Sequence, residues 1–217
     1  MNNPKLQVCF VLDCTASMQP WIDAAKEKIV DTLECIHKQY PKYKISAAFV
    51  GYRDFHDDEQ IIKIPFTKDI ETLQDLIMDI VAEGGDDVCE DVSGAYRFVN
   101  NLEWDADVKC VFHITDAPNH GAGYHEDNIE DDYPEGHPYI NLNTEVRDLA
   151  TKEVELTVFS IKRSTDIMYN IMRNIYENVY PNRFNVVRLV GRKYNTNDIF
   201  LSEISQRIAK SINSHSL

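Results

Sequence analysis

The sequence predicts an α/β fold in which a mostly parallel sheet is covered by helices on both faces. Short apolar runs alternate with amphipathic patterns of helical period along almost all of the 217 residues. That alternation is typical of parallel strands joined by helical crossovers. The polar segment 53–59 is an exception, because it joins two apolar runs and is too short for a crossover helix. Those two strands should therefore be antiparallel.

Six apolar runs are expected to form the strands of this sheet. The hairpin places one antiparallel strand toward an edge, so the expected architecture is a Rossmann-like, doubly wound, mostly parallel six-stranded sheet. The expected strands are 6–13, 44–52, 60–66, 108–115, 154–161 and 184–190.

Amphipathic segments between these runs are expected to form the helices. The first follows the first strand, and Pro20 fits its first turn. Its apolar residues step by three or four, the stripe of a half-buried helix: Ile22, Ala25, Ile29, Leu33 and Ile36. Further helices are expected at about 70–82, 90–102, 143–152, 165–179 and 196–213, the last with an inner face of Ile199, Ile204, Ile208 and Ile212.

Composition and charge limit the kinds of partner. With 22 basic and 36 acidic residues the net charge is −14, which disfavours nucleic acid and anionic membranes and suits cations or basic partners. No run approaches the roughly 18 apolar residues of a membrane span. The first residues lack the apolar core of a signal peptide. We expect a single cytoplasmic domain over 1–217, with its five cysteines reduced.

A short polar motif follows the first strand directly. Asp13, Thr15 and Ser17 alternate along the chain, so in extended backbone their side chains point the same way. All three offer hard oxygen atoms, which Mg²⁺ and Ca²⁺ prefer. The motif predicts a metal site at the mouth of the sheet; the alternative is a polar turn in which Ser17 caps the next helix.

Two other loops carry suitable atoms at the same edge. The strand 108–115 ends in a carboxylate, Asp116, as the first strand does. The segment Gly84-Gly85-Asp86-Asp87 precedes the helix expected near residue 90. Ligands of open α/β sheets bind beyond the carboxyl ends of the strands, near the topological switch point. These loops are therefore expected to meet there.

Together these motifs resemble the von Willebrand factor type A domain family over about residues 6–212. Three longer runs are similar to intracellular members that accompany atypical α-kinases: Val-Gly-Tyr-Arg-Asp at 50–54, Gly-Gly-x-Asp with Glu-Asp-Val at 84–92, and His-Ile-x-Asp-Ala-Pro-x-His-Gly at 113–121. A chain of 217 residues leaves no room for a kinase domain as well, so an associated kinase would lie outside it.

The resemblance implies a metal-ion-dependent adhesion site that holds Mg²⁺, with Mn²⁺ or Ca²⁺ as alternatives, and that binds a carboxylate of a protein partner. By position, its residues are Asp13, Thr15, Ser17, Asp87 and Asp116, and Asp86 competes with Asp87. Three carboxylates around one dication leave a net charge of −1. Such a site should hold its metal well and attract acidic partner groups poorly.

Residues near this edge are candidates for contact with the partner. Tyr52 and Arg53 follow the second strand, and His120 opens the acidic loop 120–138. We expect these residues to shape the rim of the site. For Arg53, a surface ion pair with Asp54 or Asp57 is the alternative.

The loop 120–138 also offers a transition-metal alternative. His120, His125 and His137, with Asp116, Asp131 and Asp132, would suit zinc. Their spacing matches no standard zinc pattern, so a solvated loop is favoured.

The leading functional hypothesis is a cation-dependent protein-binding module. The first alternative is a Mg²⁺-dependent hydrolase of phosphoesters that uses the same residues, with His120 as general base. No P-loop or G-x-S-x-G motif supports catalysis. A scaffold whose metal serves only stability is the third possibility.

Overall fold

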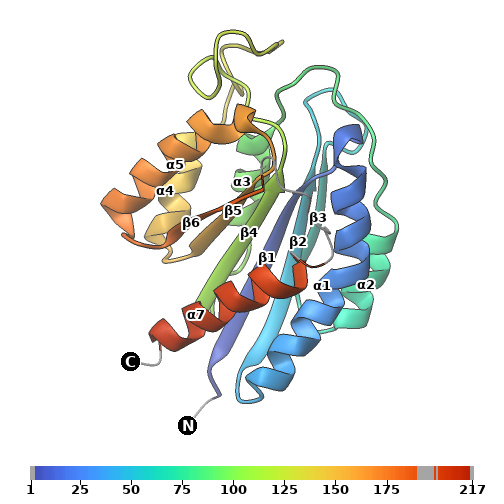
Figure 1. Cartoon of the computed structure of the whole chain (residues 1–217), viewed down its shortest axis with the longest axis vertical. Helices are drawn as coiled ribbons and strands as arrows, with labels where there is room; N and C mark the ends of the chain where they lie inside the picture. The colour runs from blue at the N-terminus through green and yellow to red at the C-terminus, as the bar shows by residue number, and fades with distance from the viewer. Residues whose placement is uncertain (1–2, 190–197, 199, 216–217) are drawn as a thin grey trace.

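A six-stranded sheet runs through the centre of the molecule in the computed structural model, which describes residues 3–189, 198 and 200–215 (Figure 1). The strand order is β3-β2-β1-β4-β5-β6. The strands are β1 (Lys5–Asp13), β2 (Lys44–Tyr52), β3 (Ile61–Thr67), β4 (Val108–Thr115), β5 (Glu155–Ser160) and β6 (Phe184–Arg188).

Neighbouring strands are parallel except at one edge. β1 pairs in parallel with both β2 and β4, and β5 and β6 continue in parallel, whereas β2 and β3 form an antiparallel hairpin. The predicted mixed sheet is therefore confirmed. The chain leaves β1 toward β2 and later returns to its other side as β4. The switch point thus lies between β1 and β4, where a ligand site is expected.

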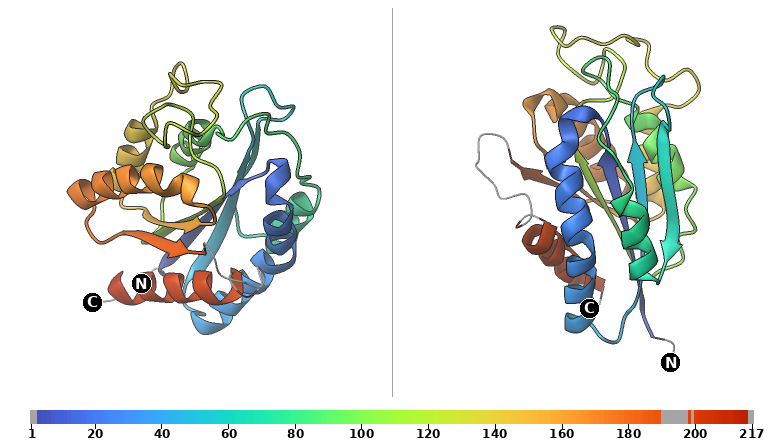
Figure 2. Two further views of the ribbon diagram at one scale, coloured as in Figure 1. Left: turned by 45° about the horizontal axis from the view of Figure 1, so that its top comes forward. Right: turned by 90° about the vertical axis from the view of Figure 1, so that its right-hand side faces the viewer.

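Helices cover both faces of the sheet (Figures 1 and 2). On one face, α1 (Gln19–Gln39), α2 (Ile70–Met78) and α7 (Ser205–His215) pack on a shared apolar core. On the other face, α3 (Val92–Asn100), α4 (Leu142–Thr151) and α5 (Asp166–Val179) cover a second core. Shorter helical turns are η1 (Ala16–Met18), η2 (Arg163–Thr165) and η3 (Phe200–Ile204), the last a π-helix.

The central strand β1 is buried on both sides, which explains its continuous apolar run. Val8 and Phe10 belong to the core under α1, whereas Cys9 and Val11 belong to the core under α3 and α4. Successive side chains of a strand point to opposite faces, so an unbroken apolar sequence is required here.

The helix boundaries differ from the prediction by a few residues. α1 begins at Gln19 with Pro20 in its first turn, as expected. α2 ends at Met78, where 70–82 was expected, because its C-cap is Asp79 and the chain then turns toward the glycines. The last helix was expected over 196–213; residues 196, 197 and 199, and residue 190 of the last strand, lie outside the described part of the chain.

The loops after β1, β2 and β4 gather at the top of the sheet in Figure 1, opposite both ends of the chain. The loop 120–138 rises above this edge (Figure 2). Among the described residues, every helix is too short or too polar to cross a bilayer.

Candidate functional site

Asp13 lies at the end of β1 with its carboxylate fully buried and hydrogen-bonded on both oxygens. Its Oδ1 accepts from the Thr15 amide (3.0 Å) and the Thr15 hydroxyl (2.7 Å). Its Oδ2 accepts from the hydroxyl of Thr115 on β4 (2.7 Å). The carboxylate therefore ties together the two strands that flank the switch point and fixes Thr15 beside it.

Ser17 and Asp116 are in contact at the same switch point, between the loops that follow β1 and β4. The Ser17 hydroxyl donates to Asp116 Oδ1 at 2.9 Å, although 99 residues separate the two in sequence. The capping role considered for Ser17 is wrong, because the N-cap residue of α1 is Met18. The hydroxyl faces β4 rather than the amides of α1.

A lysine neutralises Asp116 from the solvent side. Lys162 Nζ lies 2.6 Å from Asp116 Oδ2, and the lysine side chain is 58% exposed. The Ser164 hydroxyl also donates to the Asp116 backbone carbonyl (3.1 Å). An exposed ammonium can swing away, so this contact places a replaceable positive charge at the site.

Ser17, Asp116 and Lys162 border one cavity of about 310 Å³, which we call the strand-end cavity. Asp87 lines it and is half-buried, whereas its neighbour Asp86 is exposed. The oxygen-bearing side chains that line the cavity are Thr15, Ser17, Asp87, Glu90 and Asp116. Asp13 lies directly beneath Thr15.

Glu90 is the member of this group that the sequence did not identify. Its side chain is buried, and its Oε2 has no hydrogen-bond partner among the described residues. Gly85 makes room for it: a Cβ there would lie 2.9 Å from Glu90 Oε1 and 3.2 Å from Thr15 Cβ. Gly85 also has φ +82°, a backbone conformation that other residues rarely adopt.

Burial, reinforced by neighbouring negative charge, raises the pKa of two acids at this site. Burial, with a smaller contribution from Asp116, raises the pKa of Asp13 to about 6 despite the hydrogen bonds from Thr15 and Thr115. Burial and the charge of Asp13 raise the pKa of Glu90 to about 10. Such shifts mean that negative charge here lacks sufficient compensation from nearby positive groups. A bound cation would supply it.

Asp87 also borders a second polar cluster. Its Oδ1 accepts from the Cys89 amide (2.8 Å) and its Oδ2 from the Asp132 amide (2.6 Å). One ligand atom each of Asp54, Asp87 and His120 lie within 4.8 Å of one another. Asp87 thus stands between the strand-end cavity and His120.

Tyr52 and Arg53, expected at the rim, are both buried. The Tyr52 hydroxyl bonds to His113 Nε2 (2.9 Å) inside the core. Arg53 donates to the backbone carbonyls of Asp58 (3.1 Å), Glu59 (2.9 Å) and Val81 (2.9 Å), and its side chain is 1% exposed. The rim position is corrected for both residues: Tyr52 belongs to the core, and Arg53 holds loop carbonyls from beneath the surface.

Arg53 also differs from the expected surface ion pair. Its guanidinium lies near the carboxylates of Glu59 (3.7 Å) and Glu83 (3.3 Å). Asp57 accepts from the backbone amides of Asp54 and Gly85 instead.

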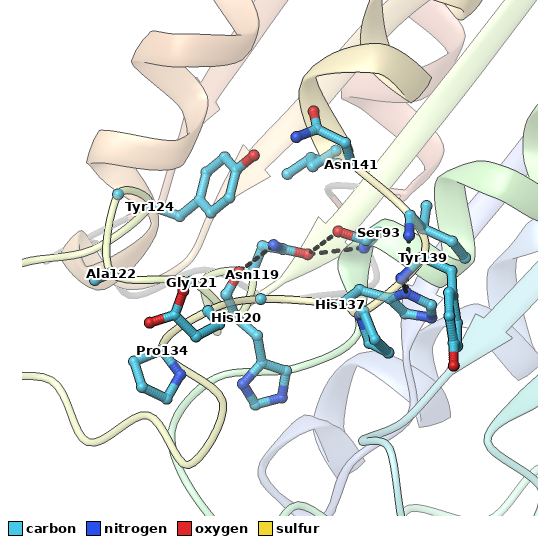
Figure 3. A pocket seen from close by; sticks show the side chains of 16 residues that line it. Ser93, Asn119, His120, Gly121, Ala122, Tyr124, Pro134, His137, Tyr139 and Asn141 are labelled. Atoms are coloured by element: carbon cyan, nitrogen blue, oxygen red, sulfur yellow. Dashed lines mark hydrogen bonds between the residues drawn. The ribbon is translucent and has the colours of Figure 1, made fainter.

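His120 is buried too, between a cluster of acids and a second cavity. That cavity has a volume of about 480 Å³ and lies beside the loop 120–138 (Figure 3). His137 and Tyr139 stand at its edge, and Tyr139 is 89% exposed. Beneath them, Asn119 Oδ1 accepts from the amide and hydroxyl of Ser93 (both 2.8 Å), as the dashed lines of Figure 3 show.

Two of the three histidines of this loop, His120 and His125, share Asp131 as a partner, whereas His137 contacts backbone amides. His125 contacts Asp131 (2.9 Å), and His137 Nδ1 accepts from the amides of Tyr139 and Ile140 (3.1 and 3.0 Å). Asp116 belongs to the strand-end cavity. The six residues of the zinc alternative therefore do not form one ligand set, although His120, His125 and Asp131 lie together.

Comparison with known proteins identifies relatives of this chain. A family model described as the von Willebrand factor A domain matches residues 7–135. The alpha-protein kinase vwkA of Dictyostelium discoideum is 31% identical over 156 residues, which are 70% of this chain and 24% of that protein. The chain thus spans about a quarter of the length of this curated relative.

Solved structures of bacterial pilus proteins share the fold. The pilus adhesin SpaC from Lactobacillus rhamnosus GG matches with a TM-score of 0.64 at 13% identity, covering 97% of this chain and 30% of SpaC. The vWF domain of the tip protein Mfa5 from Porphyromonas gingivalis gives 0.58 at 13% identity, covering 97% of both chains. The PilB minor pilin from Streptococcus sanguinis gives 0.59 at 14%, covering 96% and 61%.

The pilus proteins show the fold alone, because their identities are low. The family model covers more than half of the chain, and the Dictyostelium relative independently confirms the resemblance to A domains associated with α-kinases. The chain therefore belongs to the von Willebrand factor A domain family, whose members are typically protein-interaction modules.

Proposed function

We propose that this chain is a divalent-cation-dependent protein-binding module. The strand-end cavity is its metal-ion-dependent adhesion site, and Mg²⁺ is the expected ion, with Mn²⁺ or Ca²⁺ as alternatives. Oxygen-only ligands suit these hard cations. In this proposal the whole chain acts as one cytoplasmic domain.

The observation that carries this proposal is the convergence of oxygen ligands from three loops on one cavity. Ser17 and Asp116 are already 2.9 Å apart, and Thr15 is held beside them by the buried Asp13. Glu90 adds a buried carboxylate oxygen with no hydrogen-bond partner among the described residues. A folded protein rarely tolerates such a group without a ligand, since an unsatisfied buried polar atom costs about 1–3 kcal/mol.

Each of these residues would have its own role in binding the ion. Ser17, Thr15 and Asp116 line the cavity and would hold the ion together with Asp87, which also lines it. Asp13 already accepts three hydrogen bonds and would orient Thr15 while contributing charge. Lys162 would leave Asp116 when the ion enters, because both compete for the same carboxylate oxygen.

The partner is proposed to be a protein that offers a carboxylate to the ion. The names of the pilus adhesin and the tip protein are consistent with binding through this fold. Asp13, Asp87 and Asp116 give the ion-loaded site a net charge of −1, before any contribution from Glu90. Acidic groups are therefore expected to bind weakly, and much of the affinity must come from the surrounding surface.

The hydrolase alternative has less support. The imidazole of His120 is engaged by Asp54 (2.6 Å) and Asp131 (2.7 Å), and it lines the second cavity rather than the strand-end cavity. A general base must reach the water or hydroxyl that it activates. This geometry favours binding over phosphoester hydrolysis.

Calorimetric titration with Mg²⁺, followed by partner capture with and without EDTA, tests the proposal. Wild type should bind one Mg²⁺ at this cavity, and Asp116→Asn should abolish that binding and EDTA-sensitive capture. Asp86→Asn is the matched control, because Asp86 is exposed. Unchanged Mg²⁺ binding by Asp116→Asn would overturn the assignment. Capture that survives chelation would show that the metal serves stability only.

A further inference from the structure

We propose a second metal site, for a divalent transition ion of the zinc class, formed by His120, Asp54 and Asp87. The three residues come from three different loops at the top of the sheet. One ligand atom of each lies within 4.8 Å of the other two. His120 Nε2 is 2.6 Å from Asp54 Oδ1. Neither the family match nor the named relatives assign an ion to this place.

The imidazole is oriented toward this site by Asp131. His120 Nδ1 lies 2.7 Å from Asp131 Oδ1, so an Nδ1–H donates there, and Nε2 would bind a metal once the ion displaces the proton that Nε2 now directs at Asp54 Oδ1 (2.6 Å). Histidines that bind metals commonly donate their other ring N–H to a carboxylate in this way. Asp131 is itself fixed by the amides of Gly121 (2.8 Å) and Tyr133 (2.9 Å) and by His125.

Packing holds the ring in place. Phe55 stacks on His120 with ring centroids 4.6 Å apart, and Tyr133 packs edge-on at 4.9 Å. The His120 side chain is 1% exposed and that of Asp54 is 9% exposed. Little conformational entropy remains to be lost on binding an ion, which favours affinity.

The donor set selects the class of ion. One imidazole nitrogen and two carboxylates suit zinc better than magnesium, and they balance its charge to neutrality. In a four-coordinate zinc site, ligand atoms lie about 3.3 Å apart. The contact between His120 and Asp54 would therefore open by about 0.7 Å. Three protein ligands leave a fourth position for water or a partner group.

The other face of the imidazole is a weaker candidate. Cys89, His120 and Asp131 also come within ligand distance of one another. Asp131 already has four hydrogen-bond partners, two on each oxygen, whereas each oxygen of Asp87 accepts only one hydrogen bond. The Cys89 thiol donates to the Glu130 carbonyl (3.6 Å). The geometry thus assigns Asp131 to positioning and the Nε2 side to the ion.

The zinc site shares Asp87 with the strand-end cavity but not Asp116. Equilibrium dialysis of the full chain against Zn²⁺, with Mg²⁺ in large excess, therefore tests the zinc site through residues that belong to one site only. Wild type should retain one Zn²⁺, and so should Asp116→Asn, whatever becomes of its Mg²⁺ binding. His120→Asn should lose this Zn²⁺, and Asp131→Asn should bind it 10- to 100-fold more weakly. His37→Asn, on α1, is the matched control and should bind as wild type does.

A direct measurement guards against variants that fail to fold. Anomalous diffraction at the zinc edge from wild-type crystals soaked in Zn²⁺ should place a peak between His120 Nε2, Asp54 and Asp87. Substitution by Co²⁺ should give the visible absorption of a four-coordinate site. No peak at this position, or no retention of Zn²⁺ by wild type, would overturn the proposal even if the Mg²⁺ site is verified.

Discussion

Replacing Glu90 by glutamine should remove a pH dependence of stability that the buried acid creates. The pKa of Glu90 is raised from 4.5 to about 10 by burial and by the charge of Asp13. The folded state therefore binds a proton that the unfolded state releases above pH 4.5. Stability is fully present below that pH and is lost as the pH rises toward 10.

The magnitude follows from the linkage relation. Each unit of pH in this window costs about 1.4 kcal/mol, so wild type should lose about 3 kcal/mol between pH 5 and pH 7 through this one group. Glu90→Gln has no proton to exchange and should keep that stability. Comparing the two pH values cancels any constant effect of the glutamine amide in the site.

Urea unfolding in EDTA at pH 5 and pH 7 measures this difference. Glu103→Gln is the control, because Glu103 is exposed and should leave the wild-type slope unchanged. Mg²⁺ should restore stability to wild type at pH 7 more than to Glu90→Gln, since the ion replaces the missing positive charge. Parallel pH slopes for wild type and Glu90→Gln would refute the reasoning.

Three further predictions concern the cavity and the core. The Asp87→Thr variant loses one negative charge at the site. It should therefore bind Mg²⁺ more weakly in calorimetry and capture a carboxylate-bearing partner more strongly. Tighter Mg²⁺ binding by this variant would count against the charge argument. Lys162→Met should bind Mg²⁺ up to about fivefold more tightly, since an exposed ion pair is worth about 0.2–1 kcal/mol; weaker binding would mean that Lys162 positions Asp116. Phe10→Ala should lower the free energy of unfolding by about 3–5 kcal/mol, because Phe10 is buried against Phe112 at 6.0 Å between ring centroids; a loss below 1 kcal/mol in urea titration would contradict that packing.

The sheet and one half of the site could be predicted because they follow from local patterns. The alternation of Asp13, Thr15 and Ser17 after an apolar run indicates which side chains converge, and Asp116 ends the neighbouring strand in the same way. Parallel strands place their carboxyl ends at one edge of a sheet. The contact between Ser17 and Asp116 is thus a consequence of strand order.

Glu90 could not be recognised because the segment 86–91 contains four acids with no pattern to separate them. The Glu90 amide donates to the Pro118 carbonyl (3.0 Å), which ties this segment to the loop after β4 and turns one acid inward. The glycine at 85, whose missing Cβ leaves room for that acid, was the one available signal.

The surface position expected for Tyr52 and Arg53 failed for a related reason. Residues that follow a strand usually enter an exposed loop, but here the loop carbonyls fold back over Arg53. Whether a polar side chain points outward or collects backbone acceptors depends on the path of distant segments. Composition and periodicity carry no information about that path.

The buried guanidinium of Arg53 connects two loops at the top of the molecule. Arg53 holds carbonyls of the β2–β3 turn at Asp58 and Glu59 and the carbonyl of Val81, just ahead of the glycines. A shift of the segment Gly84–Gly85 on ligand binding would therefore also move the tip of the β2–β3 hairpin. Occupancy of the cavity would in this way be signalled to the β2–β3 hairpin at the edge of the sheet.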